Sequence, residues 1–227
     1  MSAPSAPLGF IHRFIPAEDR KEFLTLLLLH GTGGDETDLL GLGRQLAPAA
    51  ALLSPRGKVL ENGMARYFRR LGEGVFDLED LRARTHELAD FVEAAARGYG
   101  LAADRIVAVG FSNGANIAAS LILLRPAVLA GAVLFRAMVP LIPETMPDLQ
   151  GKFVFLGAGR RDSIVRPAEP KRLRRLLVRA GATVALRWEE AGHGLTPADI
   201  EAARGWLEER TRARRDESLL RGGRQER

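Results

Sequence analysis

The sequence contains no cysteine among its 227 residues. This absence excludes disulfides, a cysteine nucleophile, cysteine-ligated zinc and iron–sulfur clusters, and it is typical of a reducing compartment. Other metal-binding patterns are missing as well, since there is neither an H-x-x-x-H motif nor a cluster of carboxylates. We therefore expect no catalytic metal.

Long hydrophobic runs are also absent. The most apolar stretches, Phe23–Leu29 and Ile117–Leu124, fall short of the roughly 20 residues that span a bilayer. The first segment, residues 1–7, is rich in Ser, Ala and Pro and lacks the basic and then apolar order of a secretory signal. We expect this segment to be disordered, and the protein to be soluble and cytoplasmic without a membrane span.

An excess of one charge sign occurs only at the C-terminal end. Residues 210–227 hold seven arginines and three acidic residues, whereas the rest of the chain is nearly neutral. The basic character therefore belongs to an Arg-rich tail, residues 211–227, which has no interleaved aromatic residues. We expect no nucleic-acid partner. Salt-sensitive binding that disappears when the residues after Arg210 are deleted would support the opposite view.

Apolar runs of strand length alternate with helical patterns over residues 8–210. This alternation predicts one α/β domain with a mostly parallel sheet covered by helices on both faces. Strands are expected at residues 8–15, 23–29, 50–53, 106–110, 131–135, 153–156 and 183–188. Helices are expected at residues 38–46, 76–99, 113–124, 168–180 and 198–210, with a loop at 54–63. The tail either extends the last helix or frays, with fraying expected at Gly222–Gly223.

A serine lies between the strand pattern 106–110 and the helix pattern 113–124. Gly110–Gly114 reads Gly-Phe-Ser-Asn-Gly and matches G-x-S-x-G. A strand–turn–helix around this motif is the context of a nucleophile elbow, in which small residues on both sides let strand and helix come close. Ser112 is therefore the candidate nucleophile. The alternative is an ordinary tight turn between a strand and a helix.

A glycine-rich loop, His30–Gly34, follows the apolar strand pattern 23–29. Acyl transfer creates an oxyanion that needs two positioned donors, and an early glycine-rich loop often supplies one of them. We expect the amides of Thr32 and Asn113 to serve as this pair. The phosphate-binding patterns G-x-x-x-x-G-K-[ST] and G-x-G-x-x-G do not occur, and a plain flexible turn is the other interpretation. His30 is expected to hold the loop by hydrogen bonds.

The candidate base and acid follow later strands. His193 lies between two glycines after the last strand pattern, and Asp162 follows the strand pattern 153–156. The chain order Ser112, Asp162, His193 is that of α/β-hydrolases. The rival acids Asp148, Glu189 and Glu190 and the remaining histidines His12 and His86 are less suitably placed.

Five segments together resemble the phospholipase/carboxylesterase family of α/β-hydrolases. They read LLLLHGTGGDETDLL (26–40), SPRGKVLENGMARYFRR (54–70), VGFSNGANIAASL (109–121), GRRDSIV (159–165) and GHGL (192–195). The resemblance is greatest to the small bacterial branch that includes hydroquinone-associated esterases. It implies a cofactor-free serine esterase, often a homodimer, that acts on small carboxylic or thio esters. It also implies a triad of Ser112, Asp162 and His193, with Thr32 and Asn113 as oxyanion amides.

The pocket is predicted to be shallow, because the short spacing between Ser112 and Asp162 leaves no room for a large lid. Substrate contacts are expected from Met64, Phe68, Phe76, Arg136 and Met138, with core packing as the alternative for the apolar ones. Among Arg69, Arg70 and Arg136, one or more is expected to face the pocket and favour an anionic or aromatic acyl group, the alternative being a solvated arginine. Arg136-Ala137-Met138 stands where the wider family often has serine or glycine.

These features together predict a serine carboxylesterase that hydrolyses small esters through an acyl-serine intermediate. A thioesterase or a lysophospholipase would use the same side chains. An inactive binding protein of the same fold is the non-enzyme alternative.

Overall fold

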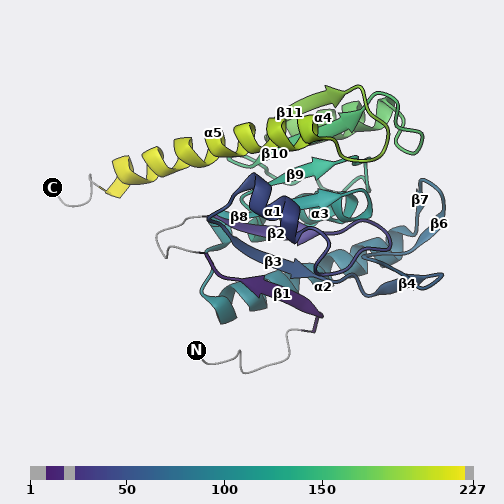
Figure 1. Cartoon of the computed structure of the whole chain (residues 1–227), viewed down its shortest axis with the longest axis horizontal. Coiled ribbons are helices and arrows are strands. Elements are labelled where there is room, and N and C mark those ends of the chain that lie inside the picture. The colour runs from purple at the N-terminus through teal and green to yellow at the C-terminus, as the bar shows by residue number, and fades with distance from the viewer. Residues whose placement is uncertain (1–8, 18–23, 223–227) are drawn as a thin grey trace.

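The computed structural model describes residues 9–17 and 24–222, and in the last helix side chains as far as residue 213. Its centre is a seven-stranded sheet in which only the first strand runs antiparallel to its neighbour (Figure 1). In spatial order the strands are β1 (His12–Ile15), β3 (Ala51–Pro55), β2 (Thr25–Leu29), β8 (Ile106–Phe111), β9 (Gly131–Phe135), β10 (Phe153–Gly159) and β11 (Thr183–Glu189). The mostly parallel sheet confirms the predicted fold class.

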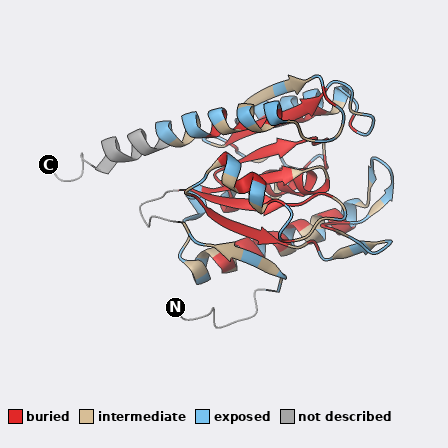
Figure 2. Cartoon of the chain, viewed as in Figure 1, coloured by how far each residue is buried: buried red, intermediate tan, exposed pale blue. Residues whose placement is uncertain are grey.

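Helices cover both faces of the sheet. One face packs against α2 (Leu78–Tyr99), α3 (Asn113–Leu124) and α4 (Ala168–Arg179), and the other against α1 (Leu40–Leu46) and α5 (Pro197–Gly222). Within β2, Leu27 and Leu29 point to the first core and Leu26 and Leu28 to the second. Because both faces are buried (Figure 2), the inner strands are almost wholly apolar, apart from Thr25 and Ser54, and lack the alternation of a half-exposed strand.

Helix α2 shows how local sequence sets an element's ends. Asp77 accepts a hydrogen bond from the Asp80 amide at the N-terminus, and Gly100 ends the helix with a left-handed φ of 70°. An acidic N-cap and a C-terminal glycine satisfy backbone groups that the helix itself leaves unpaired. Two short 3-10 turns, Ala103–Arg105 and Pro126–Val128, precede β8 and β9.

The predicted loop at 54–63 is wrong in its second half. The chain there forms a hairpin of β4 (Val59–Glu61) and β5 (Met64–Arg66), followed by a second hairpin of β6 (Arg70–Gly72) and β7 (Val75–Phe76). Two- and three-residue strands are too short to show a period of two. The dipeptide Asn62-Gly63, with φ values of 51° and 79°, carried the hairpin signal.

The ends of other elements also differ from the prediction, and strand β1 begins only at His12. Strand β10 continues to Gly159, because its pairing with β11 extends through Gly157 and Gly159. Close neighbours at both glycines leave no room for side chains. Helix α5 continues past residue 210 without a break to Gly222, which is the first of the two alternatives expected for the tail. The predicted disorder at residues 1–7 and the expected fraying at Gly223 lie outside the described residues.

The strand order reverses between β2 and β8. From β2 the sheet continues through β3 to β1, and from β8 it continues the other way through β9 and β10 to β11. In open parallel sheets such a switch point lies at a crevice beyond the carboxyl ends of the strands. The segments that follow β2, β8, β10 and β11 carry Thr32, Ser112, Asp162 and His193, so the fold places all four at one edge.

Among the described residues, no helix combines the length and the apolarity that a membrane span requires.

Candidate active site

Three side chains at this edge form a continuous hydrogen-bond chain. The Ser112 hydroxyl lies 2.9 Å from His193 Nε2, and His193 Nδ1 lies 2.9 Å from Asp162 Oδ2. The Asp162 side chain is only 1% exposed, whereas that of His193 is 20% exposed. The structure thus brings together three residues that lie up to 81 positions apart in the sequence.

Ser112 lies in a strained turn between β8 and α3. Its φ of 53° and ψ of −112° are unusual for a residue with a side chain. A Cβ on Gly114 would lie 1.9 Å from the Leu29 carbonyl oxygen, and a Cβ on Gly110 would lie 2.6 Å from Ala115 backbone atoms. Only glycine therefore permits this approach of strand and helix. The Ser112 amide donates to the Phe135 carbonyl at 2.9 Å, which fixes the turn to β9.

Asp162 is oriented by backbone donors. Its Oδ1 accepts hydrogen bonds from the amides of Ile164 and Val165 at 2.8 and 2.9 Å, which leaves Oδ2 for His193. An ionised carboxylate can only accept, so His193 carries its proton on Nδ1 and presents Nε2 as an acceptor to Ser112. The ring of Phe111 packs against the imidazole at a centroid distance of 5.3 Å.

Thr32 and Asn113 line the same cavity as Ser112. Within the described part of the chain, neither amide has a hydrogen-bond acceptor. For Asn113 this follows from its place as the first residue of α3, where helix amides lack an internal partner. The Thr32 hydroxyl accepts from Arg66 at 2.6 Å, and the Asn113 side-chain oxygen accepts from the Tyr67 amide at 2.8 Å. Both amides are thus held in place by their own side chains.

His30 holds the glycine-rich loop, as the sequence predicted. Its Nδ1 donates to the Gly31 carbonyl at 2.6 Å, and its Nε2 accepts from the Gly57 amide at 2.9 Å. This pair of partners fits only a neutral ring. Burial lowers the pKa of His30 below its ordinary value, and this effect outweighs the hydrogen bond to Gly31, which acts in the other direction.

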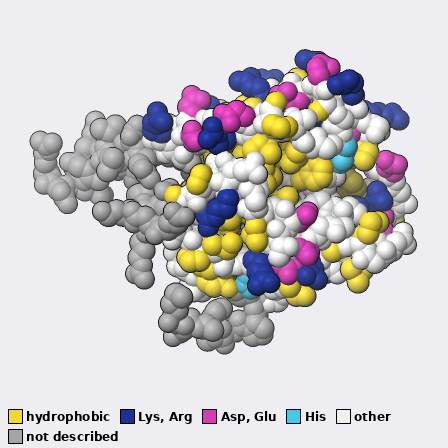
Figure 3. Space-filling model, viewed as in Figure 1, with side chains coloured by type: hydrophobic (Ala, Val, Ile, Leu, Met, Phe, Trp, Pro, Cys, Tyr) yellow, Lys and Arg dark blue, Asp and Glu magenta, His cyan; other side chains and the backbone are white. Residues whose placement is uncertain are grey.

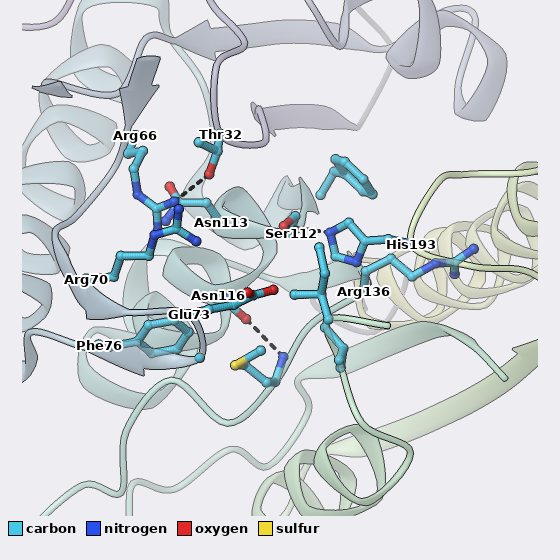
Figure 4. A pocket seen from close by; sticks show the side chains of 15 residues that line it. Thr32, Arg66, Arg70, Glu73, Phe76, Ser112, Asn113, Asn116, Arg136 and His193 are labelled. Carbon is cyan, nitrogen blue, oxygen red and sulfur yellow. Dashed lines mark hydrogen bonds between the residues drawn. The ribbon is translucent and has the colours of Figure 1, made fainter. Parts of the chain in front are cut away.

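The cavity beside Ser112 has a volume of about 230 Å³, below the range of about 300–1,000 Å³ typical of drug-sized ligand pockets (Figure 4). Phe76 and Met138 line it, as expected. Phe68 does not. Its ring is fully buried in the core against Phe76, so its expected role as a pocket residue is wrong. Met64 lies on the β4–β5 hairpin near Gly33, and it too is outside the cavity lining.

Of the three arginines considered, Arg70 lines the cavity, as expected for at least one of them, and it pairs with Glu61 at 2.7 Å. Arg69 and Arg136 differ from this expectation. Arg69 is 62% exposed and pairs with Asp77, so it is a surface residue. Arg136 borders the cavity, but its guanidinium is buried and bound to Asp199, which leaves it unavailable for an anionic acyl group. Burial alone would raise the pKa of Asp199, but hydrogen bonds from Arg136 and Thr196 lower it overall. The sequence shows that an arginine is present, but it does not show toward which neighbours the guanidinium is directed.

Several lining residues were missed by the sequence analysis. Arg66 is almost fully buried, and it contacts Thr32 and pairs with Glu61 at 3.3 Å. Asn116 lies one turn beyond Asn113 on α3 and accepts a hydrogen bond from the Met138 amide. The signal for Asn116 was the three-residue helical spacing from Asn113. Arg66 gave none, because its place depends on the hairpin that the prediction lacked.

No group of three or more His, Asp or Glu residues that could hold a metal ion occurs in the described part of the chain.

Comparison with known proteins agrees with this geometry. A model of the phospholipase/carboxylesterase family matches residues 11–210. The chain belongs to the phospholipase/carboxylesterase family. It is therefore a carboxylic ester hydrolase, and this assignment favours the enzyme over the inactive binding protein.

Individual relatives cover most of this family member. It is 51% identical to MhqD of Bacillus subtilis strain 168, a protein named as a hydrolase, over 81% of this chain and 92% of the relative. The crystal structure of the Bacillus cereus carboxylesterase is similar with a TM-score of 0.86 and 48% identity, over 88% of this chain and 94% of the other. The Mesorhizobium loti carboxylesterase gives a TM-score of 0.78 and 36% identity, over 82% and 89%.

Proposed function

We propose that this hydrolase is a serine carboxylesterase that cleaves small carboxylic esters through an acyl-serine intermediate. The observation that carries the proposal is the hydrogen-bond chain from Ser112 through His193 to the buried carboxylate of Asp162. A serine hydroxyl is a weak nucleophile until a base takes its proton, and this chain supplies the base and its orienting acid.

Acylation begins when His193 Nε2 accepts the Ser112 proton as the hydroxyl oxygen attacks the ester carbonyl. The negative charge that develops on the carbonyl oxygen is stabilised by the free amides of Thr32 and Asn113. The N-terminus of α3 points at the same place and adds a favourable dipole. Asp162 stabilises the imidazolium, which then donates its proton to the departing alcohol.

Deacylation repeats the same chemical steps with water as the nucleophile. His193 takes a proton from the water as it attacks the acyl-serine, the same two amides hold the second oxyanion, and Ser112 leaves with the proton. The products are a carboxylic acid and the regenerated hydroxyl. No cofactor is needed for either half.

The cavity favours small substrates. At about 230 Å³ its volume is below the usual range for drug-sized ligands, which suits a short acyl or aryl group better than a long alkyl chain. We therefore expect short-chain esters to be preferred over long-chain lipids. A panel of p-nitrophenyl esters of increasing chain length, with thioesters and lysophospholipids beside them, ranks these substrate classes directly.

The deciding experiment replaces the nucleophile. Ser112→Ala removes only an oxygen atom, so the fold should persist while kcat/KM for a short p-nitrophenyl ester falls by about 10³-fold or more. Circular dichroism confirms the fold, and a fluorophosphonate probe with mass mapping should label Ser112 in the native protein. Activity retained in this variant, or a label at another residue, would refute the proposal.

The expected partner is a small-molecule ester in the cytoplasm, and the family resemblance favours a homodimer. Light scattering distinguishes a 24.7 kDa monomer from a dimer.

A further inference from the structure

We propose that Arg136 is a positioning residue, which together with Asp199 holds the His193 loop at the distance that proton transfer requires. The inference rests on the proposed use of His193 as the base. It assigns a task to an ion pair that neither the hydrogen-bond chain nor the cavity lining explains.

The Arg136 guanidinium donates hydrogen bonds to the loop on both sides of His193, and Arg136 and Asp199 with these bonds are called the clamp. Its Nε donates to the Gly192 carbonyl at 3.1 Å, and one terminal nitrogen donates to the Gly194 carbonyl at 2.8 Å. The two terminal nitrogens also donate to the Asp199 carboxylate at 2.8 and 2.6 Å, in a two-pronged pair. One rigid planar group therefore fixes the backbone before and after the imidazole.

Asp199 connects this clamp to α5. Its carboxylate accepts from the Thr196 amide and hydroxyl at 2.9 Å each, and the Thr196 hydroxyl accepts from the Asp199 amide at 3.2 Å. This reciprocal pattern resembles a capping box and satisfies donors at the start of the helix. The loop from His193 to α5 is thereby tied to a fixed helix end.

Strand β9 connects the clamp to the nucleophile. Its last residue, Phe135, accepts the hydrogen bond from the Ser112 amide, and the next residue is Arg136. Arg136 has a left-handed φ of 57°, and its amide donates to the Gly157 carbonyl of β10 at 2.8 Å. One strand end therefore holds the serine turn through its backbone and the histidine loop through its side chain.

The loop needs such a clamp because glycines flank His193. Glycine has more backbone freedom than any other residue, and a Cβ on Gly194 would meet no atom within 4 Å. On the preceding side, the Arg161 amide donates to the Ala191 carbonyl and the Arg161 side chain to the Glu190 carbonyl. Beyond His193, Leu195 packs against the second core, and the polar contacts of the loop among the described residues come from Arg136 and from the Thr196–Asp199 pair.

The ion pair is poorly explained by stability alone. The side chains of Arg136 and Asp199 are 0% and 1% exposed. Taking both charges out of water offsets most of their attraction, and apolar replacements of such pairs are often neutral or stabilising. The position of this ion pair beside His193 is better explained if the pair fixes the geometry of the loop than if it adds stability.

The test removes the clamp without leaving a buried charge unpaired. In the double variant Arg136→Met/Asp199→Leu we expect a thermal midpoint close to that of the native protein. Any fall of the midpoint should be no larger than the loss of the Thr196–Asp199 cap of α5 accounts for. We expect kcat for a short p-nitrophenyl ester to fall at least 10-fold with KM changed less than twofold, and Ser112 labelling by a fluorophosphonate to slow in parallel. The Arg136→Lys variant keeps the positive charge but lacks the planar guanidinium with its several donors, so its loss of kcat should be intermediate.

A spectroscopic readout separates positioning from a general structural role. The His193 Nδ1 proton is deshielded and protected from exchange by its hydrogen bond to Asp162, so it should give a downfield NMR signal in the native protein that weakens in both variants. Arg125→Met is the matched control. Arg125 pairs with Asp90 and Glu93 at 3.0 and 2.6 Å beyond the C-terminus of α3, so its loss should leave kcat and the signal unchanged.

The outcomes are distinguishable. If the double variant keeps native kcat, labelling rate and NMR signal, the clamp is overturned while the proposed function stands. A change in KM alone would also overturn it, because it would place Arg136 against the substrate. If native protein is not labelled at Ser112, the proposed function itself fails. Should the double variant not fold, Arg136→Lys carries the same readouts and decides the question.

Discussion

His30 shows how one buried side chain can set the behaviour of a whole loop. Its ring bridges Gly31 and the Gly57 amide, and each of these bonds fixes one nitrogen of the neutral form. Tyr67 supports the same place, because its hydroxyl donates to the Pro55 carbonyl and accepts from the His30 amide. Since Thr32 lies two residues further on, the geometry of the oxyanion loop depends on an imidazole that must stay uncharged.

A pH-dependent stability follows from the lowered pKa of His30. The unfolded chain binds a proton at this residue below about pH 6.5, whereas the folded chain resists it. The contribution of His30 is therefore complete above about pH 6.5 and is lost as the pH falls toward the folded pKa. Urea unfolding of the native protein and His30→Gln between pH 5 and 8 should show a stability difference that shrinks on acidification. A difference that stays constant would contradict the assignment.

Residue types alone indicated the hydrogen-bond chain but not the arginines. Ser112, Asp162 and His193 each follow a recognisable strand in the sequence, so the topology of a parallel sheet brings them to one edge. For Arg136 the same reasoning predicts a position at the end of a strand, but it does not predict where the side chain points. Its guanidinium turns toward Asp199, 63 positions away, and such a partner is visible only in three dimensions.

The packing of helix α3 against the sheet depends on small residues at the contact. Nearly every residue of α3 is buried, and its first turn lies against the end of β2, where Gly114 meets Leu29. Gly205 in helix α5 is in the opposite situation. It is exposed, and a Cβ added there would meet no other atom within 4 Å. The same substitution should therefore have opposite signs in the two helices.

We expect Gly114→Ala to destabilise the protein by about 1–3 kcal/mol or more, because the added methyl overlaps backbone that cannot move freely. Gly205→Ala should stabilise it by about 0.5–1 kcal/mol, since alanine favours a helix and nothing obstructs it. Chemical denaturation of both variants measures the two effects. Ester hydrolysis should fall in Gly114→Ala and stay native in Gly205→Ala. Equal changes in stability would refute the packing argument.

The whole molecule consists of one sheet with two cores and a helix that projects beyond it. Helix α5 contributes Ala203, Trp206 and Leu207 to the second core and then extends away from the sheet toward the C-terminus (Figure 1). On the face shown in Figure 3, basic and acidic side chains are interspersed. This agrees with the nearly neutral composition outside the tail and does not favour a nucleic-acid surface there.

Deleting the residues after Ala213 should therefore change the free energy of unfolding by less than about 0.5 kcal/mol and leave ester hydrolysis unaltered. Trp206→Ala is the contrast. Its ring packs against Phe153 and Phe155 at centroid distances of 5.6 and 5.5 Å, so its loss should cost about 3–5 kcal/mol. Thermal and chemical unfolding compare the two proteins. A truncation that destabilises as much as the core substitution would show that the tail belongs to the fold.

The sheet could be predicted from the sequence, because strands buried on both faces are almost wholly apolar and stand out between helical patterns. The sequence also indicated the residues at strand ends, since the edge where those ends meet is a property of topology. Tertiary structure alone decided the pocket. The hairpins are too short to have a period, and Phe68 and Arg136 are assigned to core or clamp by partners far away in the chain. Local pattern specifies which elements form, whereas side-chain direction depends on contacts that exist only after those elements pack.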